Sequence, residues 1–164
     1  MIKANLDLPE RHTAVLAFLL KEIPPAEHLW ALTGSAGLRL QGVDIPVNDL
    51  DLQTDAITVF LLEKGLSPFI KLPVHLWETE HTISYHGQAQ IQDLQIELLG
   101  DIRHRLVDDT WSESLEIESA LVWVEWQDLK VPVLSLEHEA LAYERMGHTQ
   151  KACLIRSVLR KEAQ

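Results

Sequence analysis

Hydrophobic positions along the chain follow two periods, one typical of helices and one typical of strands. Over Pro9–Ile23 they form one broad face at helical spacing, and Pro24–Pro25 ends this pattern. Over Asn48–Thr54 leucines alternate with polar residues, which predicts a strand with one buried face. Further strands are expected at Leu29–Leu32, Ile70–Leu76, Thr79–Tyr85, Ala89–Leu99, within Leu115–Trp126 and at Leu129–Leu134.

Glycines and prolines indicate where the predicted strands end. The small residues of Thr33–Gly37 predict a turn after the first strand. Gly87 and Gly100–Asp101 predict turns between later strands. Because Pro73 has no N–H to donate, the strand that contains it is expected at the edge of the sheet.

Three further helices are predicted, and two of them form a helical hairpin at the C-terminus. Asp55 is suited to cap a helix at Ala56–Lys64, and Ser135 to cap one at Ser135–Met146. Thr149–Lys161 follows as the last helix. Strands embedded among helices indicate an α/β (α+β) domain with a mixed β-sheet flanked by helices. We expect residues 1–134 to form this domain and residues 135–164 to pack on it as the hairpin.

Charge and composition narrow the possible functions. Acidic residues outnumber basic ones by 25 to 14, which gives a formal net charge of −11. This balance argues against nonspecific DNA binding, which needs a surface rich in lysine and arginine. No segment approaches the roughly 20 apolar residues of a membrane-spanning helix, and no signal peptide is visible. The chain is therefore expected to be cytoplasmic, with no membrane partner.

The most informative segment combines a Gly-Ser turn with a pair of aspartates. Gly34 and Ser35 follow an apolar strand. After thirteen intervening residues, Asp49 and Asp51 lie on the alternating strand. Residues i and i+2 point from the same face of a strand, about 6.5–7 Å apart. Two carboxylates at that distance can hold a divalent cation, and Mg²⁺ favours such sites together with substrate phosphates. A glycine turn lets the backbone approach a phosphate closely.

These residues resemble the motif of the nucleotidyltransferase-fold superfamily, which includes the relatives of DNA polymerase beta and the aminoglycoside nucleotidyltransferases. The matching positions are Gly34, Ser35, Asp49 and Asp51, within about residues 28–55. The later strands and the helical tail look like bacterial stand-alone members of the superfamily. The resemblance implies the nucleotidyltransferase fold for the whole domain. An exposed amphipathic strand without function would also alternate leucine with aspartate, but it would leave the Gly-Ser turn unexplained.

The resemblance also implies a third carboxylate on a later strand. Glu97 is the first candidate, because it is a charged residue inside an apolar strand and would be costly to bury without a cation. Asp93 and Asp101, near the two ends of that strand, remain alternatives. The family more often has aspartate at the third position.

The implied reaction transfers a nucleoside monophosphate from an NTP, ATP above all, to an acceptor, with release of pyrophosphate. Asp49, Asp51 and Glu97 would hold Mg²⁺ or Mn²⁺ and activate the acceptor. Nucleotide binding is assigned to the turn residues together with Arg39 and Lys151, although both basic residues also fit an ordinary solvated surface.

The sequence is compatible with a small molecule, a protein or an RNA end as the acceptor. Two other classes of function also remain open: a nucleotide-binding module that has lost turnover, and one component of a toxin–antitoxin pair. Mg²⁺-dependent binding of an NTP without pyrophosphate release would indicate the first of these two. A small partner encoded next to this chain would indicate the second.

Overall fold

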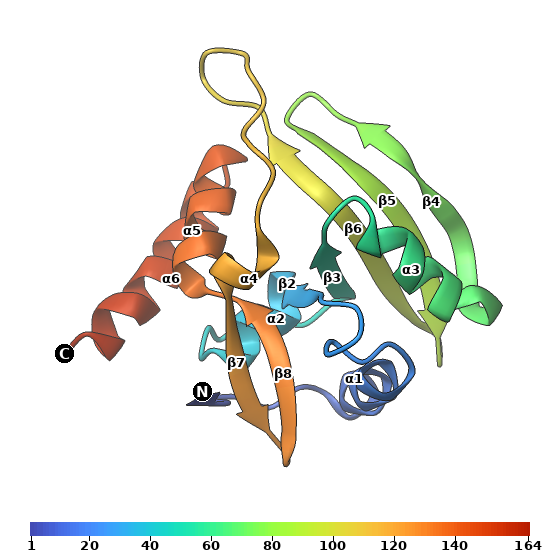
Figure 1. Ribbon diagram of the computed structural model, residues 1–164. Helices are drawn as coiled ribbons and strands as arrows, with labels where there is room; N and C mark the ends of the chain where they lie inside the picture. Colours follow the sequence, from blue (N-terminus) through green and yellow to red (C-terminus); the bar gives the residue numbers. More distant parts are fainter.

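The computed structural model describes all 164 residues and is built around one eight-stranded mixed sheet (Figure 1). Its strands are β1 (Ile2–Lys3), β2 (Ala31–Thr33), β3 (Leu50–Thr54), β4 (Ile70–Glu78), β5 (Thr82–Ile91), β6 (Leu94–His104), β7 (Leu121–Trp126) and β8 (Leu129–Leu134). The helices are α1 (Glu10–Glu22), α2 (Gly34–Leu40), α3 (Thr58–Gly65), α4 (Ile117–Ala120), α5 (Leu136–Arg145) and α6 (Thr149–Glu162), with a 3-10 turn, η1, at Ser67–Phe69. The α/β class and the mixed sheet predicted from the sequence are confirmed.

The strand order is β1-β7-β8-β2-β3-β6-β5-β4, so β2, β3 and β6 lie side by side in the interior of the sheet. β3 runs antiparallel to β2 and parallel to β6. β4 is an edge strand, as the proline at position 73 predicts. The Gly-Ser turn at the end of β2 is thereby brought beside the beginnings of β3 and β6.

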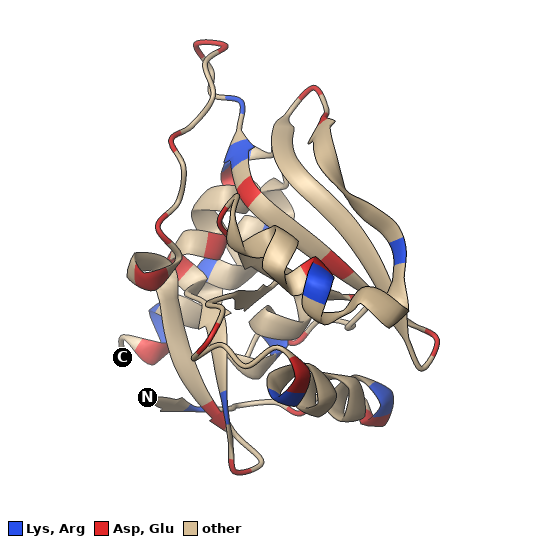
Figure 2. Ribbon diagram, turned by 45° about the vertical axis from the view of Figure 1, so that its right-hand side comes forward, with Lys and Arg blue, Asp and Glu red and all other residues tan.

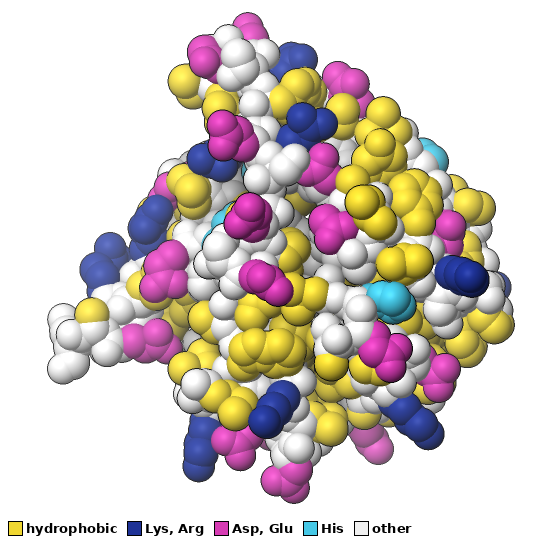
Figure 3. Space-filling view, viewed as in Figure 1, with side chains coloured by type: hydrophobic (Ala, Val, Ile, Leu, Met, Phe, Trp, Pro, Cys, Tyr) yellow, Lys and Arg dark blue, Asp and Glu magenta, His cyan; other side chains and the backbone are white.

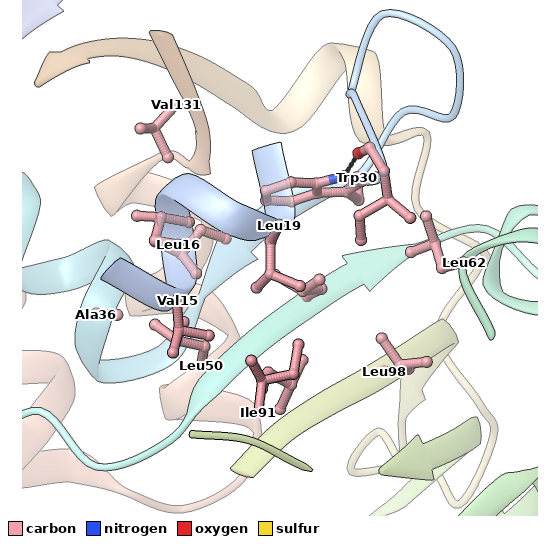
Figure 4. Close-up of a cluster of buried hydrophobic side chains, with 14 of the residues drawn as sticks. Val15, Leu16, Leu19, Trp30, Ala36, Leu50, Leu62, Ile91, Leu98 and Val131 are labelled. Atoms are coloured by element: carbon pink, nitrogen blue, oxygen red, sulfur yellow. Dashed lines mark hydrogen bonds between the residues drawn. The ribbon is translucent and has the colours of Figure 1, made fainter. Parts of the chain in front are cut away.

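Helices α1 and α3 cover one face of this sheet and bury the main hydrophobic core. Figure 4 shows Leu16 of α1 packed near Leu50 of β3, with Leu98 of β6 in the same cluster. The indole N–H of the buried Trp30 donates to the carbonyl oxygen of Ile23 at 2.8 Å, which ties the end of α1 to the entry of β2. The leucines that alternate along β3 therefore face this core, and the polar residues between them face away from it.

The two C-terminal helices form a hairpin beside α2, where the sequence predicts them (Figure 1). The hydroxyl of Ser135 accepts a hydrogen bond from the N–H of His138 and caps α5. Gly147, with φ of +79°, lies in the turn between the two helices. A second apolar cluster joins the hairpin to α2 and the segment after it, and its buried members are Leu38, Val43, Leu136, Ala140 and Ile155.

Two of the turns predicted from glycines are wrong, because both glycines lie inside strands. Gly87 is in the middle of β5, where a Cβ would lie 2.7 Å from Cγ2 of Val74 on β4. Gly100 is in β6, which continues to His104, and a Cβ there would lie 2.6 Å from Cγ1 of Val59 on α3. Both glycines therefore permit close packing of neighbouring elements. The turn between β5 and β6 is at Gln92–Asp93, where both residues have positive φ.

The segment after β2 also differs from its prediction. The sequence predicts a turn at Thr33–Gly37, but α2 begins at Gly34. Its small residues permit the close packing of this helix, since a Cβ on Gly37 would lie 2.8 Å from the carbonyl oxygen of Leu32.

Charged side chains are distributed over the whole molecule. Figure 2 shows acidic positions on helices, strands and loops alike, in line with the excess of acidic residues. In the view of Figure 3, acidic, basic and hydrophobic side chains are interspersed. None of the helices is long and apolar enough to cross a membrane.

Candidate active site

The turn after β2 has a backbone conformation that favours glycine. Gly34 has φ of +68° and follows Thr33 directly, at the start of α2. A Cβ on Gly34 would lie 2.3 Å from Oδ2 of Asp51. Both the dihedral angle and the space therefore require the absence of a side chain, and the backbone of the turn lies against this carboxylate.

Strand register brings the candidate residues into one row across the sheet. Thr33 on β2 pairs with Asp51 on β3, and Asp51 pairs with Glu97 on β6. Glu97 in turn pairs with Gln88 on β5. Asp49 lies in the bend just before β3, and its carboxylate reaches the same face, because the Gln95 amide that donates to Glu97 also donates to Asp49. The structure thus brings together the three carboxylates that the sequence proposes, on the face opposite the main core.

The carboxylate of Glu97 is held by a network of polar side chains. Its Oε2 forms a hydrogen bond with Nε2 of His86, which is only 4% exposed. Its Oε1 accepts from the amides of Gln88, at 3.1 Å, and of Gln95. The amide of Gln95 also donates to Oδ2 of Asp49 at 3.3 Å, so it joins two of the candidate carboxylates.

Burial and mutual repulsion raise the pKa values of the paired aspartates. Burial raises the pKa of Asp51 to about 7, and the charges of Glu97 and Asp49 add to this effect. Burial also raises the pKa of Asp49, together with the charge of Glu97, while a positive charge on His12 opposes the shift. A group of carboxylates with this cost of ionisation is stabilised by a cation placed among them.

The donor set fits a divalent cation held by two carboxylates. No group of three or more His, Cys, Asp or Glu side chains is arranged to hold a metal ion, and Glu97 is turned into its own hydrogen-bond network. Mg²⁺ commonly takes only one or two carboxylates and completes its shell with water and substrate phosphates. Asp49 and Asp51 match that requirement, and their raised pKa values fit a place for positive charge.

Ser35 stabilises the loop that leads to Asp49. Its hydroxyl oxygen accepts a hydrogen bond from the N–H of Asn48 at 3.2 Å, and Asn48 directly precedes Asp49. The carbonyl oxygen of Asn48 is bonded to Nε2 of His12, on α1, at 2.5 Å. The Gly-Ser turn and α1 therefore fix the position of the loop that leads into β3.

A carboxylate that sequence reasoning missed lies directly behind the turn. Glu139, on α5, accepts from the hydroxyl of Thr33 at 2.5 Å and from the N–H of Gly34 at 3.1 Å. It is 3% exposed, and burial raises its pKa to about 7. The N–H of Gly34 thus has a partner inside the protein. Helical spacing with Leu136, Ala140 and Tyr143, which also pack inward, was the signal that could have found Glu139.

The two predicted basic residues have different surroundings. Lys151, on α6, lies with its Nζ 4.6 Å from the ring centre of Tyr143, and its charge lowers the pKa values of Asp51 and Glu139. Lys151 is therefore at the site. Arg39 is not brought to the carboxylates, because its guanidinium donates to the carbonyl oxygen of Asp7 at 2.7 Å and pairs with Asp44 at 2.9 Å.

The alternatives to Glu97 lie at the two ends of β6. Asp93 is in the turn before the strand and borders the same hollow as Asp49. Asp101 forms an ion pair with Arg103 at 3.5 Å. Only Glu97 is in register with Asp51, so it is the third carboxylate of the candidate site.

Three hollows meet at the carboxylates. The first, of about 610 Å³, has Asp49 in its wall and is bordered by Arg11, His12 and Lys71. The second, of about 380 Å³, extends over β5 and β6 and is lined by Asp51, Trp77, Thr79, Thr82, Ser84, His86, Gln88, Glu97, Leu99 and Ile102. The third, of about 190 Å³, reaches from Asp51 to Glu139 and Tyr143 on α5. Two substrates can therefore approach the same carboxylates from different sides.

Sequence reasoning also missed the polar partners of Glu97. His86 and Gln88 occupy alternate positions of β5, and Gln95 precedes Glu97 by two residues on β6. Alternation of polar residues on neighbouring strands was the available signal. It was hidden because the turn was predicted at Gly87, which separates His86 from Gln88.

Comparison with known proteins agrees with this geometry. The chain matches the family described as aminoglycoside-2''-adenylyltransferase over residues 15–155. A proposed nucleotidyltransferase from Thermotoga maritima, known from its crystal structure, is 33% identical, with 96% of this chain and 98% of that chain covered and a TM-score of 0.83. No curated protein matches the chain.

A second solved structure is similar in fold. The lincosamide antibiotic adenylyltransferase LnuA, with lincomycin bound, is 14% identical, with 93% of this chain and 99% of that chain covered and a TM-score of 0.56. The matched segment of the family contains every residue from Gly34 to Lys151 that forms the candidate site. The chain belongs to the aminoglycoside-2''-adenylyltransferase family and has the nucleotidyltransferase fold.

Proposed function

We propose that the protein is a magnesium-dependent adenylyltransferase, which transfers AMP from ATP to a hydroxyl group of a small acceptor molecule and releases pyrophosphate. The observation that carries this proposal is the position of Asp51 and Glu97 on neighbouring strands, with Asp49 just before β3 and the Gly34–Ser35 turn directly beside Asp51. Family membership supports a nucleotide substrate, and the adenylyl group follows the family's description.

Asp49 and Asp51 would hold Mg²⁺, with Mn²⁺ as a substitute. The bound ion would neutralise charge on the triphosphate and on the leaving pyrophosphate. Ser35 is assigned to the outer phosphates, since its hydroxyl proton remains free to be donated while its oxygen accepts from Asn48. Lys151 supplies positive charge on the side of α6.

Glu97 is assigned to the acceptor. The acceptor oxygen forms a bond to the α-phosphorus, and the bond from that phosphorus to the oxygen it shares with the β-phosphate breaks. Pyrophosphate leaves with the shared oxygen, and the proton of the acceptor hydroxyl passes to the Glu97 carboxylate. The hydrogen bonds from His86, Gln88 and Gln95 hold that carboxylate in one orientation. Catalysis then rests on positioning and on neutralisation of charge.

The hollow over β5 and β6 favours a small, neutral or positively charged acceptor. It contains the carboxylates of Asp51 and Glu97 but neither lysine nor arginine, so a phosphate-rich acceptor such as RNA would be repelled. Its volume of about 380 Å³ is within the range of small-molecule sites. Trp77, with half of its surface exposed, offers a flat apolar face on which a sugar ring can pack. The names of the relatives, which refer to aminoglycosides and a lincosamide, agree with a hydroxylated antibiotic or a similar sugar.

The test is a coupled measurement of pyrophosphate release and acceptor modification. The purified protein is incubated with ATP and Mg²⁺ and with aminoglycosides, lincosamides or a tRNA, and each acceptor is examined by mass spectrometry for one added adenylyl group. We expect modification of a small hydroxylated acceptor, dependent on Mg²⁺ and accompanied by pyrophosphate.

Two outcomes would contradict the proposal. Modification of the tRNA alone would show that the acceptor class is wrong. ATP binding without pyrophosphate release for any acceptor would favour the interpretation as a nucleotide-binding module without turnover.

A further inference from the structure

Glu139 is a buried carboxylate that the proposed reaction does not use. It lies on α5 with 3% of its surface exposed, and its Oε1 accepts from both Thr33 and Gly34. A buried carboxylate is costly unless it is hydrogen-bonded or paired with a positive charge. Helix packing alone therefore does not explain a carboxylate at this position of α5.

The packing of α5 does not require a carboxylate at this position. Two neighbours of Glu139 on the helix, Leu136 and Ala140, are already buried in a cluster with Leu38 and Ile155. An apolar side chain at position 139 would avoid the cost of burying a carboxylate. The carboxylate lies where α5 contacts the backbone of the Gly-Ser turn, since its Oε1 accepts from the N–H of Gly34.

The hydrogen bonds of Glu139 lead directly to the proposed cation ligand. Thr33, one donor, pairs with Asp51 across β2 and β3. Gly34, the other donor, lies so close to Asp51 that a Cβ would be 2.3 Å from its Oδ2. A displacement of this turn would therefore push the Asp51 carboxylate or leave a gap beside it. The two hydrogen bonds to Glu139 on α5 oppose such a displacement.

We propose that Glu139 is a positioning residue, which makes the C-terminal hairpin a working part of the nucleotide site. By holding Thr33 and Gly34, it fixes the backbone that contacts Asp51 and thus fixes this carboxylate for binding of nucleotide and Mg²⁺. Glu139 itself touches neither the nucleotide nor the ion. This inference rests on the proposed function, since it concerns the same nucleotide site.

The experiment is calorimetric titration of ATP with Mg²⁺ into the full-length protein and four variants. Glu139→Ala removes the acceptor of both hydrogen bonds, Glu139→Gln keeps an acceptor oxygen without the charge, and Thr33→Val removes one donor with little change of shape. Glu137→Ala, on the exposed side of the same helix, is the matched control. Both the dissociation constant and the binding stoichiometry are determined, because a variant that is only partly folded loses stoichiometry but not affinity.

We expect Glu139→Ala to weaken binding about tenfold at full stoichiometry, the scale of a hydrogen bond to a charged group. Glu139→Gln is expected to stay within about threefold of the wild type, Thr33→Val to weaken binding about threefold, and Glu137→Ala to bind like the wild type. If Glu139→Ala does not fold, the affinities of Glu139→Gln and Thr33→Val decide by the same criteria.

The inference is overturned if Glu139→Ala binds with wild-type affinity. If Glu139→Ala does not fold, wild-type affinity of Thr33→Val overturns it instead. It is overturned as well if Glu139→Gln binds as weakly as Glu139→Ala. Asp51→Asn separates this failure from that of the proposed function. Binding by the wild type that is lost in Asp51→Asn but unchanged in Glu139→Ala contradicts the positioning role alone. If the wild type does not bind ATP with Mg²⁺, the proposed function and this inference fail together.

Discussion

Gly34 and Asp51 are in contact across the end of β2, with the glycine backbone against the aspartate carboxylate. A Cβ at position 34 would lie 2.3 Å from Oδ2 of Asp51, which is shorter than any stable contact between such atoms. The glycine of the motif therefore has two tasks. It adopts φ of +68°, and it leaves room for the carboxylate to remain in place.

Gly34→Ala is expected to disturb both stability and nucleotide binding. The backbone strain costs about 1 kcal/mol, and the clash with Asp51 adds about 1–3 kcal/mol, as overpacking usually does. Denaturant unfolding measures the loss of stability, and ATP titration measures the loss of nucleotide binding. Gly147→Ala is the control, because Gly147 has φ of +79° but nothing within 4 Å of a Cβ. Equal losses in the two variants would show that the contact with Asp51 is unimportant.

Asp49→Asn and Asp51→Asn should each abolish Mg²⁺-dependent transfer. The amide lacks the charge that a divalent cation requires, so we expect a loss of at least about a hundredfold in turnover with the fold preserved. Pyrophosphate release measures the turnover, and circular dichroism measures the fold. Asp44→Asn serves as the control, since Asp44 is exposed and pairs only with Arg39. Activity that survives in both site variants would refute the assigned cation ligands.

In the absence of a divalent cation, stability should fall as the pH rises. The pKa of Asp51 is about 7, compared with an ordinary value of 3.8. Between about pH 4 and about pH 7 the folded state therefore holds a proton that the unfolded state has released. The free energy of unfolding decreases over this window, by a few kcal/mol for such a shift.

Asp51→Asn cannot titrate and should show a shallower decrease. Urea denaturation of both proteins at about pH 5 and about pH 8 measures the difference. If the free energy of unfolding falls equally between the two pH values in the wild type and in Asp51→Asn, the pKa of this carboxylate is not raised.

Lys151 and Arg39 should differ in their effect on nucleotide binding. Lys151→Met removes the positive charge beside Asp51 and Glu139, so we expect ATP to bind several-fold more weakly and the pKa of Asp51 to rise further. Arg39→Gln should leave the affinity unchanged, because the guanidinium is engaged by Asp7 and Asp44. ATP titration of both variants provides the comparison. A larger loss in Arg39→Gln would reverse the assignment.

The parts of the site that sequence could predict are those fixed within short segments. Gly34 and Ser35 follow one predicted strand directly, and Asp49 and Asp51 are two residues apart on the alternating segment that comes next. Glu97 followed from a local conflict, a charge within an apolar strand. The placement of Glu97 opposite Asp51, however, depends on the register of β3 and β6, and the sequence of β6 alone does not reveal that register.

What sequence could not predict depends on contacts between distant segments. Glu139 is one of several glutamates on an amphipathic helix. Helical spacing separates it from the exposed Glu137, but its contact with the Gly-Ser turn depends on how α5 docks. The positive charge of Arg39 made it a candidate for binding the triphosphate, but α2 carries it toward Asp44. Gly87 and Gly100 were interpreted as turns because glycine ends strands more often than it permits close packing, and the packing partners lie on other elements.

The position of β4 at the edge of the sheet has a consequence for how such proteins diversify. Trp77 lies on this strand, whose residues are mostly exposed and which is paired on one side only. The proposed chemistry belongs to β3 and β6, in the interior of the same sheet. Substitutions along β4 can therefore reshape what the hollow accepts at little cost in stability. The proposed reaction centre can thus stay unaltered while the range of accepted molecules changes at this margin of the sheet.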